Sequence, residues 1–239
     1  KGILPDQKNI EDIQGFVSSA MIYDINLKSG EEKNVYIAIP LHKKEPELNI
    51  KMSETEIKKG IERLYRENID FWQSRVSGFE IDIPEKEITN TLKSNICFNL
   101  VTRDGPGFQP GARSYDKSWI RDGGMAAVAL LRMGLTSEIR EFIDWFTSFQ
   151  TQDGLVPPII DSKEDDPLWE EKPPHNLIEY DCQGEYIFTV LQYYLFTSDM
   201  EFLKNKLINV KKACEYLVYL RKQTMTSEFK DGAPDKRKY

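Results

Sequence analysis

The feature that most constrains this chain is a series of helical segments whose connections alternate between short and long. After residue 83, apolar residues recur at helical spacing in segments that begin near residues 84, 122, 136, 183 and 199. Gly134–Thr136 and Thr197–Asp199 form the tight connections. The other two connections take about 16 and about 32 residues, whereas neighbouring helices are usually joined by about 2–8. This alternation predicts a mainly α fold built from helical hairpins.

The same alternation predicts where a functional site would lie. Successive helices in an up-and-down series are antiparallel, so alternate connections fall at opposite ends of the bundle. Both long connections therefore meet at one end, where side chains on loops can converge. The segments 122–133 and 183–196 are apolar nearly all round, so we expect them to be the inner, buried helices. The segments that follow each of them are amphipathic, and we expect these on the outside.

The chain before these helices has a different character. Apolar and β-branched residues in 15–25 and 35–40, separated by a turn-like segment, predict two β-strands. Ser53 and Glu56 have the capping-box spacing, in which each side chain accepts a hydrogen bond from the other residue's backbone N–H. The apolar stripe that follows them has helical spacing and predicts a linker helix of about 20 residues.

Composition excludes several classes of function. No run approaches the about 18 consecutive apolar residues that a membrane-spanning helix needs. The net charge is −7, which argues against a nucleic-acid partner because a phosphate backbone favours a basic surface. A neutral ligand such as a sugar suits an acidic protein. The three cysteines and two histidines match no metal-binding spacing, so we predict no metal site.

We expect this chain to be part of a longer protein. It begins at Lys1 rather than at a methionine, and its last residues, 236–239, belong to a charged stretch with no closing structural element. For this reason the sequence assigns neither a cellular compartment nor an oligomeric state.

A chemically suggestive group lies where the first long connection enters a helix. A pyranose needs an aromatic face for its C–H surface and planar groups that grip neighbouring hydroxyls. Trp119, Arg121 and Asp122 supply that set within four residues. Gly123 and Gly124 remove side chains where a ligand or a neighbouring helix comes close. The alternative is structural: Asp122 caps the helix, and the other two side chains pack beneath it.

Further acidic residues lie along the second long connection. Asp153 stands in an Asp-Gly turn, which is equally consistent with the plain end of a helix. Glu179 and Asp181 approach the next helix, and Glu185 lies one turn inside it. Acidic residues near a helix N-terminus are favoured by the helix dipole alone, so a structural role stays open beside the functional one. The acidic run 161–171 is typical of a solvated loop.

Taken together, the motifs resemble those of the six-hairpin glycosidases, and most of all the glucoamylase-like enzymes. The resemblance covers roughly residues 84–225. It depends on the order and spacing of Ser118–Gly124, Gln152–Gly154, Tyr180–Glu185, Tyr193–Tyr194 and Thr197–Asp199. It implies an incomplete (α/α)6 barrel that is preceded by a β segment and a linker helix. The implied domains are the end of a β-sandwich-like domain, a linker helix and the first hairpins of a truncated barrel, at 1–50, 51–80 and 81–239.

The resemblance also implies roles for individual residues. Arg121 and Asp122 would hold the non-reducing sugar, with Trp119 beside them. The general acid of such enzymes would lie beyond Tyr239, so the catalytic residues stay unassigned. The remaining acidic residues would line the same funnel, which requires Asp122, Asp153 and Asp181 to meet at one mouth. These residues are Asp153, Glu179, Asp181 and Glu185.

The implied activity is hydrolysis of an O-glycosidic bond in an oligosaccharide or glycoconjugate, of the α-glucosidase or glucoamylase type. Two carboxylates about 6.5–9.5 Å apart would act with inversion, one as acid and one as base. No cofactor is implied. Two alternatives stay open: a glycoside phosphorylase on the same scaffold, and a carbohydrate-binding helical module without catalysis.

Overall fold

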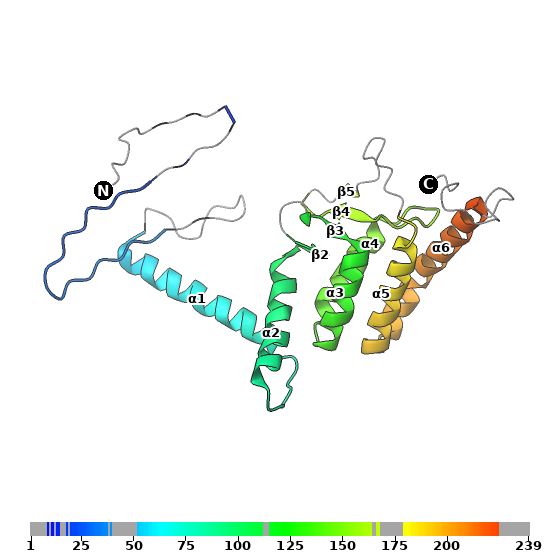
Figure 1. Cartoon of the computed structure of the whole chain (residues 1–239), viewed down its shortest axis with the longest axis horizontal. Helices are drawn as coiled ribbons and strands as arrows, with labels where there is room; N and C mark the ends of the chain where they lie inside the picture. The colour runs from blue at the N-terminus through cyan, green and yellow to red at the C-terminus, as the bar shows by residue number, and fades with distance from the viewer. Residues whose placement is uncertain are drawn as a thin grey trace. The chain divides into compact units, whose positions relative to one another are not determined.

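The structure is a computed structural model of the whole chain (Figure 1), in which the described part is mainly helical. The chain divides into two compact units, residues 1–62 and 63–239, and each is described by itself. Within the described part, no helix is both long and apolar enough to cross a membrane. The structure describes residues 9, 11, 13–14, 18, 20–37, 39, 52–111, 115–163, 166–167 and 179–224.

The first unit contains the expected turn but no strand within residues 20–37. The backbone N–H of Glu31 donates to the carbonyl oxygen of Lys28 at 3.0 Å, and Gly30 supplies the positive φ of 83° between them. The flanking residues are almost all exposed and carry no strand assignment. A hairpin of two strands is marginal in water without further strands or a packed face, which accounts for the difference. Several residues of both expected strands lie outside the described residues.

Helix α1, Glu54–Val76, is the linker helix predicted from the capping box. The backbone N–H of Ser53 donates to Glu56 Oε2 at 2.8 Å, and the N–H of Glu56 donates to Ser53 Oγ at 3.3 Å. The reciprocal cap is therefore present as the sequence predicts. The two units divide inside α1, between residues 62 and 63, rather than at either end of the predicted linker.

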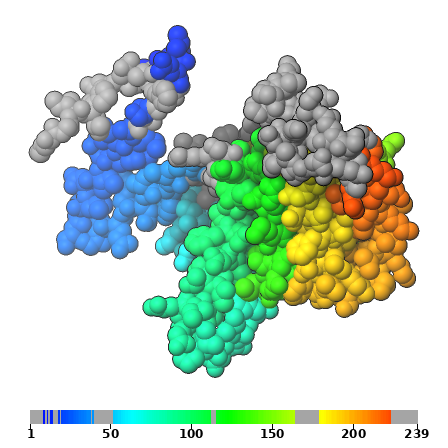
Figure 2. Space-filling model, turned by 45° about the vertical axis from the view of Figure 1, so that its right-hand side comes forward, coloured from blue at the N-terminus to red at the C-terminus, as the bar shows by residue number. Residues whose placement is uncertain are grey.

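The second unit contains all the helices expected after residue 83. The turn between α3 and α4 contains Gly134, at a φ of 84°, and Leu135. Ser198 and Asp199 form the turn between α5 and α6. α3, α5 and α6 lie side by side, and α4 packs on α3 and α5 (Figures 1 and 2). The helices are α2 (Lys86–Val101), α3 (Ile120–Arg132), α4 (Thr136–Ser148), α5 (Cys182–Thr197) and α6 (Met200–Thr224).

The long connections meet at one end of these helices, as expected (Figure 1). Each contributes short strands that the sequence did not predict. β1 and β2 form an antiparallel pair, and β3, β4 and β5 form a three-stranded sheet in that order. The pairing of β3 with β4 joins one long connection to the other. The strands are β1 (Arg103–Asp104), β2 (Gly107–Phe108), β3 (Ser118–Trp119), β4 (Ile159–Asp161) and β5 (Asp166–Pro167).

The core forms where one face of α4 packs on α3 and α5. Two glycines of α3 allow the close approach of these helices. A Cβ on Gly123 would lie 2.3 Å from Cζ of Phe142, and a Cβ on Gly124 would lie 2.7 Å from Oγ1 of Thr189. Both glycines therefore serve helix packing, one toward α4 and the other toward α5. The buried face of α4 consists of Ile139, Phe142, Ile143 and Phe146.

The expectation that the most apolar helices are the most buried is wrong for α5. Within the described residues, α5 leaves a stripe of large apolar side chains exposed, whereas the amphipathic α4 has the most completely buried face. The reason is that α3, α4 and α6 pack on the rest of α5, while the stripe has no helix packed over it in the described part. The exposed residues are Phe188, Leu191, Leu195 and Phe196.

Candidate functional site

A cluster of charged groups lies at the N-termini of α3 and α5. Arg121, in the first turn of α3, grips Asp181 with two donors, Nε to Oδ2 at 2.7 Å and Nη2 to Oδ1 at 2.9 Å. The same Nη2 also donates to Oε2 of Glu179 at 2.7 Å. A planar guanidinium matches the two oxygens of a carboxylate, and such paired bonds are among the stronger polar contacts in proteins. The structure thus brings together three of the predicted site residues.

The contacts of Arg121 set the charge states in this cluster. The hydrogen bond from Arg121 lowers the pKa of Asp181 below its ordinary value, although partial burial opposes this effect. The bond to Asp181 likewise raises the pKa of Arg121. At neutral pH both groups are therefore charged. Nη1 of Arg121 has no hydrogen bond or ion pair within the described residues, so two of its five donors remain for a ligand.

Glu185 lies beside this cluster, one turn inside α5. Burial, followed by the nearby charge of Asp181, raises the pKa of Glu185. Its Oε2 lies 3.6 Å from the position that a Cβ on Gly124 would take, so Glu185 faces the start of α3. The carboxyl group has no hydrogen-bond partner within the part of the chain that the structure describes. Glu185 thus joins Arg121 and Asp181 as the sequence predicts.

Three potential metal ligands also occur in this cluster: Glu179, Asp181 and Cys182 offer ligand atoms within 4.8 Å of one another. Arg121 already forms an ion pair with each of the two carboxylates. Burial, together with the charge of Glu179, raises the pKa of the Cys182 thiol, which disfavours the thiolate that binds metals. A cation would have to displace Arg121, so these residues fit an arginine better than a metal ion.

Asp122 lies against a different feature, a cavity of about 440 Å³ between the end of α2, β2 and the start of α3. Consecutive residues of a helix point about 100° apart, so Asp122 cannot face the same side as Arg121. No residue of the Arg121 cluster lines this cavity. Asp122 has no hydrogen-bond or ion-pair partner among the described residues. The cavity is lined by Phe98, Asn99, Thr102, Phe108, Gln109, Pro110, Asp122, Met125 and Ala126.

The cavity combines exposed apolar side chains with hydrogen-bond acceptors. Phe98 and Met125 are 68% and 69% exposed, which is unusual for side chains of this size. Nδ2 of Asn99 donates to a backbone carbonyl in α2, and Nε2 of Gln109 donates to the backbone oxygen of residue 116. Their amide oxygens, and the carboxylate of Asp122, have no partner within the described residues. The cavity therefore favours a ligand with hydroxyl or amine donors and an apolar face.

Trp119 lies at the end of β3, where Ser118 and Trp119 pair with Ile160 and Ile159 of β4. Its ring is tilted against the ring of Tyr115, with 5.8 Å between centroids. Trp119 thus belongs to the short sheet that precedes α3. It does not line the Asp122 cavity.

Asp153 has no hydrogen bond or ion pair with the other predicted residues among the described ones; its partners are Thr151 and Tyr216. It accepts a hydrogen bond from Thr151 in the turn after α4 and helps to raise the pKa of Tyr216, for which burial is the larger cause. The turn is attached to α6 because Nε2 of Gln150 donates to the backbone oxygen of Asn209 at 3.0 Å. One mouth shared by Asp122, Asp153 and Asp181 stays a prediction.

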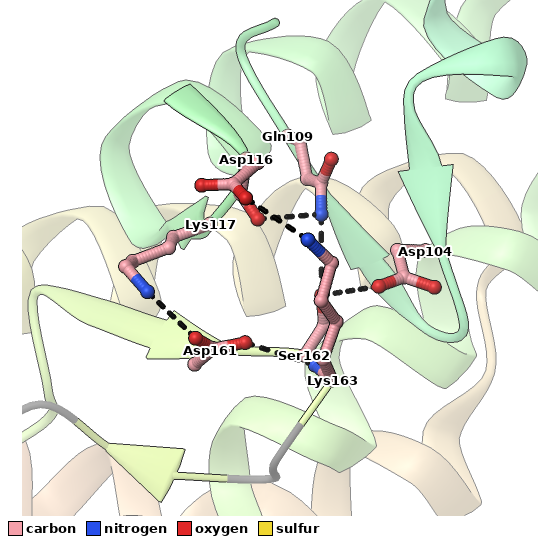
Figure 3. Close-up of polar contacts among 7 residues, drawn as sticks. All are labelled: Asp104, Gln109, Asp116, Lys117, Asp161, Ser162 and Lys163. Carbon is pink, nitrogen blue, oxygen red and sulfur yellow. Dashed lines mark hydrogen bonds and ion pairs between the residues drawn. The ribbon is translucent and has the colours of Figure 1, made fainter. Parts of the chain in front are cut away.

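The structure also identifies a polar network that sequence reasoning missed (Figure 3). From the sequence, the acidic run 161–171 is typical of a solvated loop. In the structure, however, Asp161 accepts a hydrogen bond from Lys117 at 2.6 Å. The sequence could have indicated this network through the pair of opposite charges in each long connection. Such pairs do not predict which charged side chains form ion pairs with each other. The network comprises Asp104, Gln109, Asp116, Lys117, Asp161, Ser162 and Lys163.

Comparison of this chain with family models, with curated proteins and with solved structures finds no match in any of the three.

Proposed function

We propose that this chain contributes the sugar-binding pocket of a glycoside hydrolase of the glucoamylase-like kind. The proposal joins the resemblance of the motifs to one observation, the half-apolar cavity beside Asp122. A pyranose presents hydroxyl donors around its rim and C–H groups on its face. Asp122, Asn99 and Gln109 offer acceptors for the hydroxyls, while Phe98 and Met125 offer apolar surface for the face.

In this proposal Arg121 has a second role beside the pocket. Its contacts with Asp181 and Glu179 fix the first turn of α3 relative to the start of α5. That attachment orients the neighbouring Asp122 without contacting the cavity. Nη1 of Arg121 remains able to donate to a ligand hydroxyl that reaches across the helix N-terminus. The pocket would raise a reaction rate only if it gripped the distorted sugar more tightly than the relaxed one.

We also propose that the two helical hairpins, α3 with α4 and α5 with α6, are consecutive hairpins of an (α/α)6 barrel. The alternation of tight and long connections supports this arrangement, because it gathers the long connections at one end. The exposed apolar stripe of α5 supports it as well, since a barrel would cover that face with further helices. Trp119 would then lie at the rim of the site rather than inside it.

A matched pair of variants tests the pocket. Asp122→Asn removes the charge beside the cavity, and Asp153→Asn makes the same change at an exposed carboxylate outside it. Binding of maltose and of methyl glycosides of several sugars would be followed by saturation-transfer NMR and calorimetry. We expect Asp122→Asn to weaken sugar binding about tenfold or more, because a charge-assisted hydrogen bond contributes about 1.5–3 kcal/mol. Equal binding by both variants and the unchanged chain would contradict the pocket assignment.

Turnover separates the proposed hydrolase from its alternatives. A hydrolase releases sugar from maltose in phosphate-free buffer, whereas a phosphorylase requires inorganic phosphate. A binding module without catalysis binds sugar and releases none under either condition. The carboxylates that act as acid and base are not assigned in this chain, so turnover is measured on the full-length protein.

A further inference from the structure

The two long connections are held together by two ion pairs that cross. Nζ of Lys117 lies 2.6 Å from Oδ2 of Asp161, and Nζ of Lys163 lies 2.9 Å from Oδ2 of Asp116 (Figure 3). Each connection therefore supplies one lysine and one aspartate, and each lysine pairs with the aspartate of the other connection. We call these four residues the crossed clamp. The Lys117–Asp161 pair is the more buried, with side chains 31% and 16% exposed.

The crossed clamp reaches a wall of the Asp122 cavity through Gln109. Nε2 of Gln109 donates to the backbone oxygen of Asp116 at 2.8 Å and to Oγ of Ser162 at 3.3 Å. Oγ of Ser162 in turn donates to Oδ2 of Asp104 at 3.1 Å. Gln109 is thus attached to one clamp residue and to the immediate neighbour of two others. Its amide donor is used in the network, which leaves the amide oxygen as an acceptor for a ligand.

The crossed clamp also flanks the strand pair that leads into α3. Ser118 follows Lys117 directly, and its Oγ donates to the backbone oxygen of Phe108 at 2.9 Å. The backbone N–H of Ile120 donates to the carbonyl oxygen of Pro158 at 3.1 Å, just before β4. The residues that follow Ile120 are the site residues of the first turn of α3. The position of that turn therefore depends on the two connections remaining together.

We propose that Lys117, Asp161, Lys163 and Asp116 are positioning residues, which hold Gln109 and the first turn of α3 in the arrangement that the Asp122 cavity needs. The inference rests on the proposed function for the identity of the ligand. Groups that are already ordered lose less conformational freedom when a ligand binds, so the effect appears in affinity. Ion pairs on a protein surface contribute little to stability, so loss of the more exposed Lys163–Asp116 pair should leave the unfolding temperature almost unchanged.

The test compares variants of the full chain by two measurements. Lys117→Met removes the more buried pair, Lys117→Arg keeps it, and Lys86→Met removes an exposed ion pair with Asp82 outside the network. Hydrogen exchange followed by mass spectrometry reports on the peptides that contain Gln109 and residues 118–122. Calorimetry with maltose gives the dissociation constant.

We expect Lys117→Met to speed exchange in those two peptides and to raise the dissociation constant for maltose about threefold to tenfold. Lys117→Arg should leave both the exchange rates and the dissociation constant as in the unchanged chain, because it keeps the positive charge opposite Asp161. Lys86→Met should change neither. Lys163→Met provides a second, more exposed variant in case Lys117→Met does not fold, and it should act in the same direction.

Unchanged exchange in both peptides of Lys117→Met and Lys163→Met would overturn the inference, whatever maltose does. An equal loss of unfolding temperature and of exchange protection throughout α3 to α6 would also overturn it, because the clamp would then be a general stabiliser. Failure of the unchanged chain to bind maltose or any other sugar counts against the proposed function instead. In that case the exchange data alone decide whether the clamp positions Gln109 and α3.

Discussion

At the scale of single residues, two neighbouring glycines and one arginine determine how α3 is placed. The sequence predicts that a ligand or a neighbouring helix comes close to Gly123 and Gly124, and in the structure each glycine faces another helix. Arg121 looks like a group that binds sugar directly, yet two carboxylates occupy most of its donors. The residue types thus pointed to the start of α3 as a place of close contacts, while the partner of each residue depended on the fold.

Replacing Gly123 by alanine should destabilise the second unit. The new Cβ would lie 2.3 Å from Cζ of Phe142, whose ring is fully buried and cannot move away without disturbing the core. Overpacking of this kind typically costs about 1–3 kcal/mol, which chemical denaturation would measure as a lower unfolding free energy. Gly184→Ala is the control, since a Cβ there meets nothing within 4 Å. A stable Gly123→Ala variant would contradict the packing of α3 on α4.

Replacing Arg121 by glutamine should make the free energy of unfolding depend less on pH in the acid range. The hydrogen bond from Arg121 lowers the pKa of Asp181 in the folded state. The ion pair therefore stabilises the fold fully at pH values above the pKa of Asp181 in the unfolded chain, about 3.9. This stabilisation is lost as the pH falls through the lowered pKa of the folded state. Both side chains are more than a third exposed, so the contribution is about 1 kcal/mol or less.

Thermal unfolding between pH 2 and pH 7 tests this expectation. The unfolding temperature of the variant should lie below that of the unchanged chain at neutral pH, and the two should converge in acid. Asp82→Asn is a control for charge, since Asp82 forms an exposed ion pair at the start of α2. Parallel curves for the Arg121 variant and the unchanged chain would show that the Asp181 contact contributes nothing.

At the scale of elements, the helix ends differ in how they are capped. Ser, Thr and Asp are preferred at helix N-caps, and such residues stand at the starts of three helices: Ser53, Thr136 or Ser137, and Asp199. Ser53 and Asp199 do cap their helices, the latter through a bond from the N–H of Phe202 to Oδ1 at 2.9 Å. Thr136 instead becomes the first residue of α4, and Leu135 at the N-cap position makes no side-chain cap. Buried packing of Leu135 in the tight turn overrides the local preference for a cap.

The two positions should therefore respond differently to alanine. Asp199→Ala removes the cap of α6 and a contact with Arg140, and it should lower the unfolding free energy by about 1–2 kcal/mol. Thr136→Ala removes no cap and should have almost no effect. Circular dichroism during urea unfolding would measure both. Equal losses would mean that the expected cap at Thr136 exists in solution.

At the scale of the whole molecule, the two units differ in how much packed core they contain. Residues 20–37 are almost all exposed, whereas the core residues belong to the second unit. Exposed chain with few buried contacts opens easily and is cut first by proteases. We expect brief trypsin treatment to cut after Lys28 or Lys33 before it cuts anywhere in α3 to α6. Mass spectrometry of the products would show this order, and early cleavage inside α4 or α5 would contradict it.

The helices of the second unit could be predicted from short-range patterns in the sequence. Helical periodicity and the tight connection at Gly134 depend on residues only a few positions apart, so they are visible without a fold. Glu179, Asp181 and Glu185 lie near Arg121, because all four are close to the helix ends that the long connections reach. The turn that carries Asp153 packs on α6, a contact that no short-range pattern in the sequence indicates.

The sequence by itself determined that the chain is mainly helical, which segments form the helices, and at which end the long connections meet. Only the tertiary structure decided that Asp122 lines a cavity while Arg121 pairs with Asp181 and Glu179, and that Lys117 pairs with Asp161 across two connections. The physical reason is the distance along the sequence over which each interaction acts. Helix formation is settled by neighbours within about one turn, whereas an ion pair or a cavity requires residues far apart in sequence to be brought within a few ångströms by packing elsewhere.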